Sequence, residues 1–341
     1  MTQTVCDRCL IEIENIGAKI ALIPLAEPRT IARGTETAAK TVQVRVSGAG
    51  KVGLGEACAM SRYGETQESV LAQIEAVAPK LVGRFAREDL ANVLPAGAAR
   101  NALDCAFWDL EAKQSGVAAE VRAMVAPMAP IVTAYTITIK SPEEMAEVAR
   151  REGHRPLLKI KLGHFEDDRA RMEHVRRAAP DTRLIVDANE GWTFDQLKEM
   201  VPVLKAAGVE LIEQPLHATR DDPLCGYECG IPLCADEACH TRASLPDVEG
   251  KYGYINIKLD KTGGVTEALA LAREARKRGF GVMIGCTNGT TLAMAPGLIV
   301  AQLCSICDLD AAMFLREVES GETVYMGSEL DWSSARRWGL P

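Results

Sequence analysis

Short apolar runs recur through the second half of the chain, and a charged residue ends each of them. The runs are LLKIKLG, RLIVDAN, GVELIEQP, IPLCADE and YINIKLDK, and the charged residues are Lys161, Asp187, Glu213, Asp236 and Lys258. Consecutive members lie 26, 26, 23 and 22 residues apart. One strand, one helix and two loops take about that length, so the spacing predicts βα units of a parallel barrel. Because all strands of such a barrel point the same way, we expect the five side chains to converge at one mouth.

The repeated units extend from TAYTITI at 133–139 to CSICDLD at 304–310. Each run is almost entirely apolar, which is typical of parallel strands covered on both faces. Segments with the apolar spacing of helices alternate with the runs, at 166–178, 194–207 and 265–278. We therefore predict an α/β fold in which residues 126–314 form a (β/α)7β TIM-like barrel that carries the candidate site.

The first part of the chain has a different pattern. Apolar and polar positions alternate in LIEIENIGAKIALI, TVQVRVSG and KVGLGEA, which predicts antiparallel strands. The intervening segment 24–39 (PLAEPRTIARGTETAA) contains turn residues and no period, so we expect a long loop there. Helical spacing follows at 66–85 and 98–115. We predict an N-terminal α+β capping domain over residues 1–125, completed by the C-terminal segment 315–341.

Composition narrows the function. The chain has 341 residues and a formal net charge of −8, which argues against nucleic acid and an anionic membrane surface as partners. Residues 280–307 contain no charged residue, but their glycines, proline and polar residues favour buried barrel elements over a membrane span. Gly48-x-Gly50-x-x-Gly53 matches a dinucleotide-binding pattern. The alternation after it predicts a strand in place of the required helix, so we expect a hairpin turn.

The 11 cysteines are odd in number and scattered, which favours a reducing, cytoplasmic compartment over a disulfide framework. Two C-x-x-C pairs, Cys6/Cys9 and Cys304/Cys307, have no second pair at zinc-finger spacing. We expect them to be small packing residues, with a zinc or redox role as the open alternative.

The three acids at the strand ends indicate a metal site. Asp187, Glu213 and Asp236 offer hard oxygen ligands without sulfur or imidazole, which favours Mg²⁺, with Mn²⁺ as an alternative. Any one of them alone could equally be a helix cap or a salt-bridged acid. Three at the ends of consecutive strands predict a divalent-metal centre.

Lysines make up the other half of the candidate chemistry. Lys159 and Lys161 lie two positions apart on one predicted strand, so both point inward, and Lys258 comes from across the barrel. A nearby cation and partial desolvation lower a lysine pKa toward the value that a neutral amine base needs. The set fits removal of a proton next to a carboxylate. Two bases on opposite faces indicate a 1,1-proton transfer, although a dehydratase or cycloisomerase could use the same lysines.

The ordered set Lys-x-Lys, Asp, Glu, Asp and Lys resembles that of the enolase superfamily, muconate-lactonizing subgroup, over nearly the whole chain. Enolase-type sites use a lysine base beside Mg²⁺. Within the subgroup the chain is most similar to the dipeptide epimerases, in the segments IARG, RYGE, LPAGAARNALDCAFWDL, LIVDANE, ADEACHTR and NIKLDKTGG. The resemblance implies that the three acids bind Mg²⁺. It also implies that Lys161 is the base for the L-substrate and Lys258 for the D-substrate, while Lys159 binds the carboxylate and lowers the pKa of Lys161.

The same resemblance assigns the substrate contacts. In dipeptide epimerases an Asp-x-Asp after the last strand holds the α-ammonium of the dipeptide, and Asp308 and Asp310 match it; a solvated loop is the alternative. Loops of the first domain would close over the mouth, where Arg33 suits a glutamate side-chain carboxylate. Tyr63 and Thr136 are further expected substrate contacts.

The implied reaction is Mg²⁺-dependent inversion of the second residue of L-Ala-L-Glu through an enediolate, in murein peptide turnover. Alternatives are an o-succinylbenzoate synthase, an N-acylamino acid racemase or a cycloisomerase of the same superfamily, and a metal-binding barrel without activity. Segment 285–291 departs from the Met- and Glu-containing sequence common there, which leaves the fine specificity open. Family members often assemble, so a homo-oligomer is an expectation from the resemblance alone.

Overall fold

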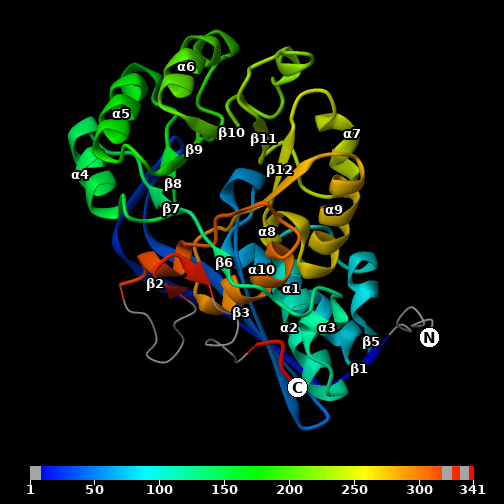
Figure 1. Cartoon of the computed structure of the whole chain (residues 1–341). Helices are drawn as coiled ribbons and strands as arrows, with labels where there is room; N and C mark the ends of the chain where they lie inside the picture. Colours follow the sequence, from blue (N-terminus) through cyan, green and yellow to red (C-terminus); the bar gives the residue numbers. More distant parts are fainter. Residues whose placement is uncertain (1–8, 317–324, 331–337) are drawn as a thin grey trace.

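The computed structural model describes residues 9–316, 325–330 and 338–341. Figure 1 shows a curled sheet of parallel strands with helices around its outside, and a second unit of antiparallel strands and helices beside it. The predicted class, a TIM-like barrel with an N-terminal α+β capping domain, is confirmed.

Eight parallel strands within the described residues form the curled sheet, in the order in which they follow along the chain. They are β7 (Tyr135–Ile137), β8 (Leu157–Lys161), β9 (Arg183–Asp187), β10 (Val209–Glu213), β11 (Leu233–Ala235), β12 (Tyr254–Ile257), β13 (Gly281–Ile284) and β14 (Ile306–Cys307). A 2.8 Å hydrogen bond from Ala134 N to Cys307 O links the two ends of the sheet. The charged ends of β8 to β10 therefore lie on adjacent strands at one mouth.

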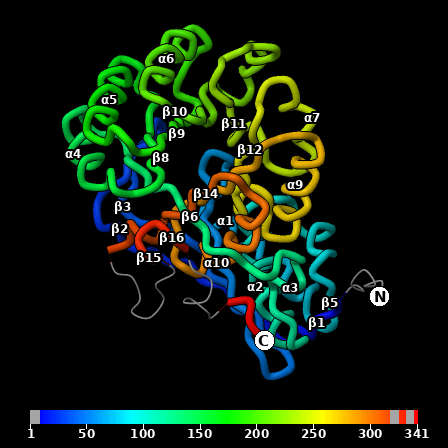
Figure 2. Tube along the Cα trace, in the orientation of Figure 1, coloured from blue at the N-terminus to red at the C-terminus, as the bar shows by residue number. Residues whose placement is uncertain are grey.

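Helices follow the strands around the outside of the sheet (Figure 2). They are α4 (Pro142–Glu152), α5 (Phe165–Ala178), α6 (Phe194–Ala206), α7 (Leu245–Val248), α8 (Leu259–Thr262), α9 (Val265–Lys277) and α10 (Thr291–Ala301). The three predicted helices are confirmed to within one residue as α5, α6 and α9. Ser141 and Thr193 begin α4 and α6 as N-caps, because their side chains accept a hydrogen bond from a free N–H of the first turn.

Alternation along the strands separates two apolar clusters. Leu158 and Ile160 of β8 pack with the helices in the large outer cluster. A small inner cluster is made of Ala134, Leu157, Ile185, Leu211, Cys234 and Met283. Because side chains of a strand alternate between faces, Lys159 and Lys161 share the inner face with Leu157. The apolar cluster thus fills the interior beneath the charged residues at the mouth.

The capping domain is built on a three-stranded antiparallel sheet of β2 (Asn15–Ile31), β3 (Gly34–Gly48) and β4 (Lys51–Cys58). The prediction for 98–115 is confirmed as α2 (Ala98–Ser115). The helix predicted over 66–85 is present as α1 (Gln67–Leu81), but its last predicted residues belong to a strand that begins at Gly83. Both helices share an apolar cluster with the sheet. The short helix α3 spans Ala119–Arg122, and β1 (Leu10–Ile13) pairs with β5 (Gly83–Ala86).

The prediction of a long loop over residues 24–39 is wrong. β2 and β3 continue through this segment and turn at Ala32 and Arg33, with a register irregularity between Pro24 and Arg29. β2 is an edge strand, where a proline costs no sheet hydrogen bond, and the irregularity hides the alternating period. The consequence for function is that Arg33 lies at the tip of a long hairpin.

The pattern Gly48-x-Gly50-x-x-Gly53 lies in a β-hairpin, as predicted. β3 and β4 meet in a two-residue turn at Ala49 and Gly50, whose φ angles are 48° and 70°. A Cβ atom at Gly53 would lie 2.1 Å from Ala106 O of α2. Gly53 therefore allows α2 to pack closely on β4. The glycine pattern is explained by this packing and by the hairpin turn, not by nucleotide binding.

The C-terminal residues contact both units. β15 (Tyr325–Met326) and β16 (Glu329–Leu330) form a sheet with β6 (Ile131–Val132), while Trp338 Nε1 donates to Leu54 O of β4. Residues 317–324 and 331–337 lie outside the described part, so the boundary at 125/126 and the C-terminal completion of the capping domain stay predictions. No helix in the described ranges is long and apolar enough to cross a membrane, and residues 280–307 hold β13, α10 and β14.

Candidate active site

The five charged strand-end residues meet at the mouth. Lys161, Asp187 and Glu213 end β8, β9 and β10, and both Lys161 and Glu213 stand opposite Asp187 in the strand register. Asp236 and Lys258 directly follow β11 and β12. One carboxylate oxygen from each of the three acids lies within 4.8 Å of the others, and all three acids are buried. The structure thus brings together the residues that the sequence pattern selected.

Two lysines approach this acid triad (Asp187, Glu213 and Asp236) from different sides. Lys161 Nζ donates to Asp187 Oδ2 over 2.6 Å, and Lys258 Nζ donates to Asp236 Oδ2 over 2.6 Å. Their strands, β8 and β12, are four positions apart in the eight-stranded sheet. The two amines therefore flank the space above the triad from opposite parts of the mouth.

Lys159 lies deeper, at the centre of the acids. Its Nζ is 2.6 Å from Glu213 Oε2, 2.7 Å from Asp308 Oδ2 and 3.2 Å from Asp187 Oδ2. Burial by itself lowers the pKa of Lys159, but these three carboxylates outweigh it and hold the pKa well above its ordinary value. Lys159 is thus a fixed positive charge here, and its expected effect on Lys161 stays a prediction.

The same balance governs the neighbouring groups. Burial lowers and the carboxylates of Asp236 and Glu213 raise the pKa of Lys258, with a net upward shift. Burial also raises the pKa of Glu213 to about 7, helped by the nearby charge of Asp187. For Asp187, the charges of Lys161 and Lys159 overcome burial and hold the pKa below its usual value. Nearby lysines thus outweigh burial at Asp187, whereas burial and a like charge prevail at Glu213.

The donor set fits a hard divalent cation. The triad offers three buried carboxylates and no sulfur or imidazole, which is the ligand chemistry of Mg²⁺ and Mn²⁺. Four lysines, Lys159, Lys161, Lys258 and Lys261, form ion pairs with buried acids of the mouth. A bound divalent cation would add positive charge beside them, which favours the neutral amine of a neighbouring lysine.

Two supporting residues escaped the sequence pattern. Lys261 Nζ is fully buried and donates to Asp236 Oδ1 over 2.6 Å and to the carbonyls of Cys239 and Asn256. Asn256 Nδ2 donates to Glu213 Oε1 over 2.7 Å. Asn256 could have been found, since it lies two positions before Lys258 and shares its face of the strand. Lys261 sits in the short helix α8, where no strand period applies.

The Asp-x-Asp pair closes another side of the mouth. Asp310 Oδ2 accepts a 2.7 Å hydrogen bond from Thr136 N, and the Thr136 hydroxyl lies 3.4 Å from Asp308 Oδ1. Both acids are buried, which rules out the alternative of a solvated loop. Burial and the adjacent charge of Asp308 raise the pKa of Asp310. The structure thus brings Asp308, Asp310 and Thr136 together, and Lys159 ties them to the acid triad.

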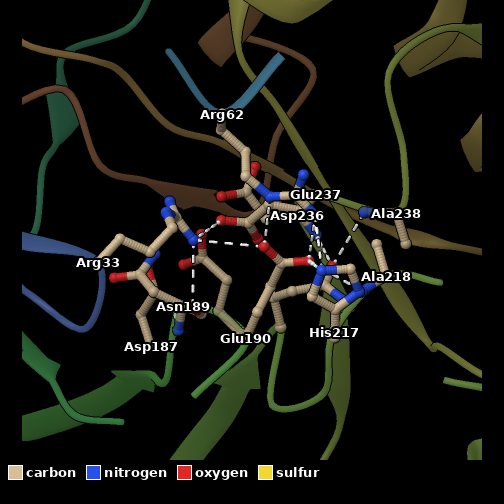
Figure 3. A network of polar contacts seen from close by, with 12 residues as sticks. Arg33, Arg62, Asp187, Asn189, Glu190, His217, Ala218, Asp236, Glu237 and Ala238 are labelled. Carbon is tan, nitrogen blue, oxygen red and sulfur yellow. Dashed lines mark hydrogen bonds and ion pairs between the residues drawn. The ribbon is translucent and has the colours of Figure 1, made fainter. Parts of the chain in front are cut away.

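Two arginines of the capping domain reach over the mouth (Figure 3). Arg33 Nη1 donates to Glu237 Oε1 over 2.7 Å and to Asn189 O over 3.1 Å. Arg62 binds the Glu190 carboxylate through two hydrogen bonds, of 2.7 and 2.9 Å. Arg33 therefore lies where a substrate side chain could meet it, although its partner in this structure is a protein carboxylate.

Tyr63 follows Arg62 and also faces the mouth. Its ring packs edge-on against His240 with centroids 4.3 Å apart. Its hydroxyl is buried without a hydrogen-bond partner in the described part of the chain. Burial and the charges of Asp236 and Glu237 raise its pKa, so the hydroxyl remains a neutral donor.

Segment 285–291 is tied to both units. The Thr287 hydroxyl donates to Asp260, and Thr290 N donates to Glu56 Oε1 of β4 over 2.8 Å. The side-chain amide of Asn288 donates a hydrogen bond to Glu36 Oε2 of β3. The segment whose sequence departs from the expected one is thus part of the seam between barrel and cap.

Two family descriptions match the chain. Residues 16–121 match the mandelate racemase / muconate lactonizing enzyme N-terminal domain, and residues 141–323 match the enolase C-terminal domain-like family. Together the matches span both structural units.

Named relatives are similar over most of their length. The L-Ala-D/L-Glu epimerase of Escherichia coli is 45% identical over 296 residues, which cover 86% of this chain and 91% of that protein. An N-acetyl-D-glutamate racemase from a Pseudoalteromonas species is 42% identical over 290 residues, covering 84% and 91%.

Solved structures show the same architecture. An enolase family member from Agrobacterium tumefaciens with homology to dipeptide epimerases, holding sodium and L-Ala-L-Glu, superposes with a TM-score of 0.92 at 43% identity, covering 95% of this chain and 99% of that one. A dipeptide epimerase from Enterococcus faecalis with Mg and L-Leu-L-Tyr gives a TM-score of 0.89 at 27% identity, covering 97% and 99%.

Proposed function

The chain belongs to the mandelate racemase / muconate lactonizing enzyme family of enolase-like proteins, and on that premise we propose that it is a Mg²⁺-dependent dipeptide epimerase. The proposed reaction inverts the α-carbon of the second residue of L-Ala-L-Glu to give L-Ala-D-Glu, reversibly. The observation that carries this proposal is the placement of Lys161 and Lys258, each 2.6 Å from a different acid of the triad and on opposite sides of the mouth.

Each group at the mouth has a proposed role. Asp187, Glu213 and Asp236 would hold Mg²⁺, which supplies positive charge for the substrate carboxylate when bound. Lys161 removes the α-proton of the L-form and Lys258 returns a proton to the other face, which inverts the centre; the roles exchange in the reverse direction. Lys159 adds a fixed positive charge for the carboxylate as the substrate becomes an enediolate.

Asp308 and Asp310 favour a dipeptide over an N-acylated amino acid. The similarity to the N-acetyl-D-glutamate racemase makes such a substrate the second candidate. An N-acetyl group carries no charge, whereas a dipeptide presents an ammonium that pairs with buried carboxylates. Two buried acids facing Thr136 therefore support the dipeptide, and Arg33 supports an acidic second residue.

We place the reaction in the cytoplasm, on dipeptides released from murein. The cysteines from Cys58 to Cys307 are free thiols, which suits a reducing compartment. L-Ala-L-Glu and its epimer have the chemistry of murein peptide fragments, so recycling of these fragments is the proposed role.

Proton NMR in D₂O tests the reaction directly. With enzyme and Mg²⁺, L-Ala-L-Glu is expected to lose the glutamate α-proton signal while the signals of L-Ala-D-Glu appear. A parallel sample with EDTA should show neither change, which tests the metal. Faster exchange of N-acetyl-D-glutamate than of any dipeptide would overturn the proposal in favour of the racemase.

A further inference from the structure

We propose that Arg62 and Glu190 form a latch that seats the capping domain on the barrel and positions the candidate metal ligand Asp187. Glu190 is a positioning residue in this proposal, since it acts through its neighbours. The kinetic consequence rests on the proposed dipeptide epimerase function. The latch itself is a contact between the two units and can be measured without turnover.

The Glu190 carboxylate is bound by both units of the protein. Arg62 of the capping domain donates to both of its oxygens, over 2.7 and 2.9 Å. Ala218 N of the loop after β10 donates to Oε1 over 2.8 Å, and His217 Nε2 lies 3.2 Å from Arg62. The Glu190 side chain is 5% exposed and that of Arg62 30% exposed. Arg33 Nη1 of the same domain also lies 3.6 Å from Glu190 Oε2. Loss of Arg62 would therefore leave the nearly buried Glu190 carboxylate with only this longer ion pair and the Ala218 N–H, which weakens its stabilisation.

The backbone that carries Glu190 is strained. Asn189 and Glu190 have φ angles of 46° and 67°, which few residues other than glycine adopt. Hydrogen bonds hold this conformation, from Glu190 N to Gln214 O over 2.9 Å and from Gly191 N to Ala188 O over 2.8 Å. Strained conformations persist only where the surroundings hold them. Here the result is a carboxylate turned toward the capping domain, three residues after a candidate metal ligand.

Asn189 connects the latch to Asp187. Its backbone N–H donates to Asp187 Oδ1 over 2.8 Å, and its Nδ2 lies 3.2 Å from Asp187 Oδ2. Its carbonyl accepts the second capping-domain arginine, Arg33, over 3.1 Å. Figure 3 shows these residues side by side at the mouth. Movement of Glu190 would therefore pass to the Asp187 carboxylate through one residue.

The capping-domain side of the latch is equally fixed. Glu65 accepts hydrogen bonds from Met60 N and from Ala98 N at the start of α2, both of 2.9 Å. Gly97 fits here because a Cβ atom would lie 2.6 Å from Glu65 Oε1. The turn that carries Arg62 is thus braced against the longest helix of the capping domain. Both ends of the ion pair are held by their own units, which is what a latch between units requires.

The test is a double-mutant cycle with Arg62→Met, Glu190→Gln and the double variant. We expect each single variant to raise the KM for L-Ala-L-Glu on the order of ten- to a hundredfold, with a smaller change in kcat. The double variant should be no worse than the poorer single one. Arg62→Lys keeps the charge but loses the two-point contact, so an intermediate KM is expected, and this variant keeps the test valid if Arg62→Met fails to fold.

The matched control is Arg183→Met. Arg183 binds Glu210 through the same two-point geometry at the opposite end of β9 and is exposed. Its loss should leave KM unchanged. Unchanged KM in the Arg62 and Glu190 variants, or effects that simply add in the double variant, would overturn the latch.

Two measurements keep the latch separate from the proposed function. Titration of the wild type and variants with Mg²⁺ should show weaker binding in Glu190→Gln than in Arg183→Met. Hydrogen exchange should show faster exchange of the amides of residues 60–65 in Glu190→Gln. If the wild type epimerises nothing, the proposed function fails while these two results still decide the latch; equal Mg²⁺ affinity and equal exchange would refute it.

Discussion

The barrel and the capping domain contribute to the same mouth with side chains of very different burial. Lys159, Asp187 and Asp236 are at most 1% exposed and lie on or next to strands of the barrel. Arg33 and Arg62 have side chains about one-third exposed and lie in turns of the capping domain. Groups on packed strands hold their geometry, whereas groups on turns can differ between relatives without disturbing the core. The chemistry is thus expected on the barrel side and the choice of the second residue's side chain on the cap side.

The largest effect is expected on removal of one of the two proposed bases, Lys161 or Lys258. Lys161→Ala should slow loss of the α-proton from L-Ala-L-Glu by about a thousandfold or more, because its general base is gone. Exchange from L-Ala-D-Glu should persist, since Lys258 is the proposed base for that proton. Proton NMR in D₂O with each epimer measures both rates. Lys258→Ala is the mirror control, and equal effects of one variant on both epimers would contradict two separate bases.

A smaller effect is expected at the Asp-x-Asp pair, which lies at the barrel end and is proposed to bind the ammonium of the dipeptide, far from the reacting carbon. Asp308→Asn should raise the KM for dipeptides by roughly a hundredfold, because the ammonium loses a buried charged partner. The KM for N-acetylglutamate should change little. Steady-state kinetics on both substrates, with a Mg²⁺ titration as control, makes the comparison. An equal loss on both would show that Asp308 acts through Lys159, 2.7 Å away, and not as a clamp.

A change in the capping domain is expected to alter the preference between dipeptides more than the rate of the chemical step. Arg33→Met is expected to lower kcat/KM for L-Ala-L-Glu about tenfold relative to a dipeptide with an apolar second residue, because a partly exposed guanidinium contributes modestly. Competition between the two dipeptides, followed by NMR, gives the ratio. Arg33→Lys should retain part of the preference. An unchanged ratio would mean that Arg33 only holds Glu237.

An effect on stability, not on catalysis, is expected at the seam between the two regions. Asp260 accepts hydrogen bonds from Cys58 N and Asn101 of the capping domain and from Thr287 of the barrel. Burial raises its pKa to about 6, because its described hydrogen-bond partners are neutral groups. As the pH rises, this carboxyl ionises in the unfolded state before it ionises in the folded state. The free energy of unfolding therefore falls as the pH rises from about 4 to about 6, and it stays lower above that range.

Asp260→Asn should remove this dependence. Relative to the wild type, the variant is expected to gain roughly 2 kcal/mol of unfolding free energy between pH 4 and pH 7. Denaturant unfolding at the two pH values measures the change. A difference between variant and wild type that is the same at both would contradict the raised pKa.

The barrel prediction depended most on the alternation of side chains between the two faces of each strand. The alternation that turns Leu157 inward also turns Lys159 and Lys161 inward, and it would have found Asn256 beside Lys258. The same reasoning failed at residues 24–39, where two prolines and a register irregularity conceal the edge strand β2. An edge strand tolerates both features, because one of its sides has no partner strand.

The sequence by itself determined the period of the βα units, the acids and lysines at the strand ends and the family. These follow from alternation and spacing, which act over a few residues at a time. Only the tertiary structure decided that Lys261 neutralises Asp236 and that Arg62 binds Glu190, 128 residues away along the chain. The first contact depends on how the short helix α8 packs on the barrel, and the second on how the two units pack against each other; no local period records either kind of packing.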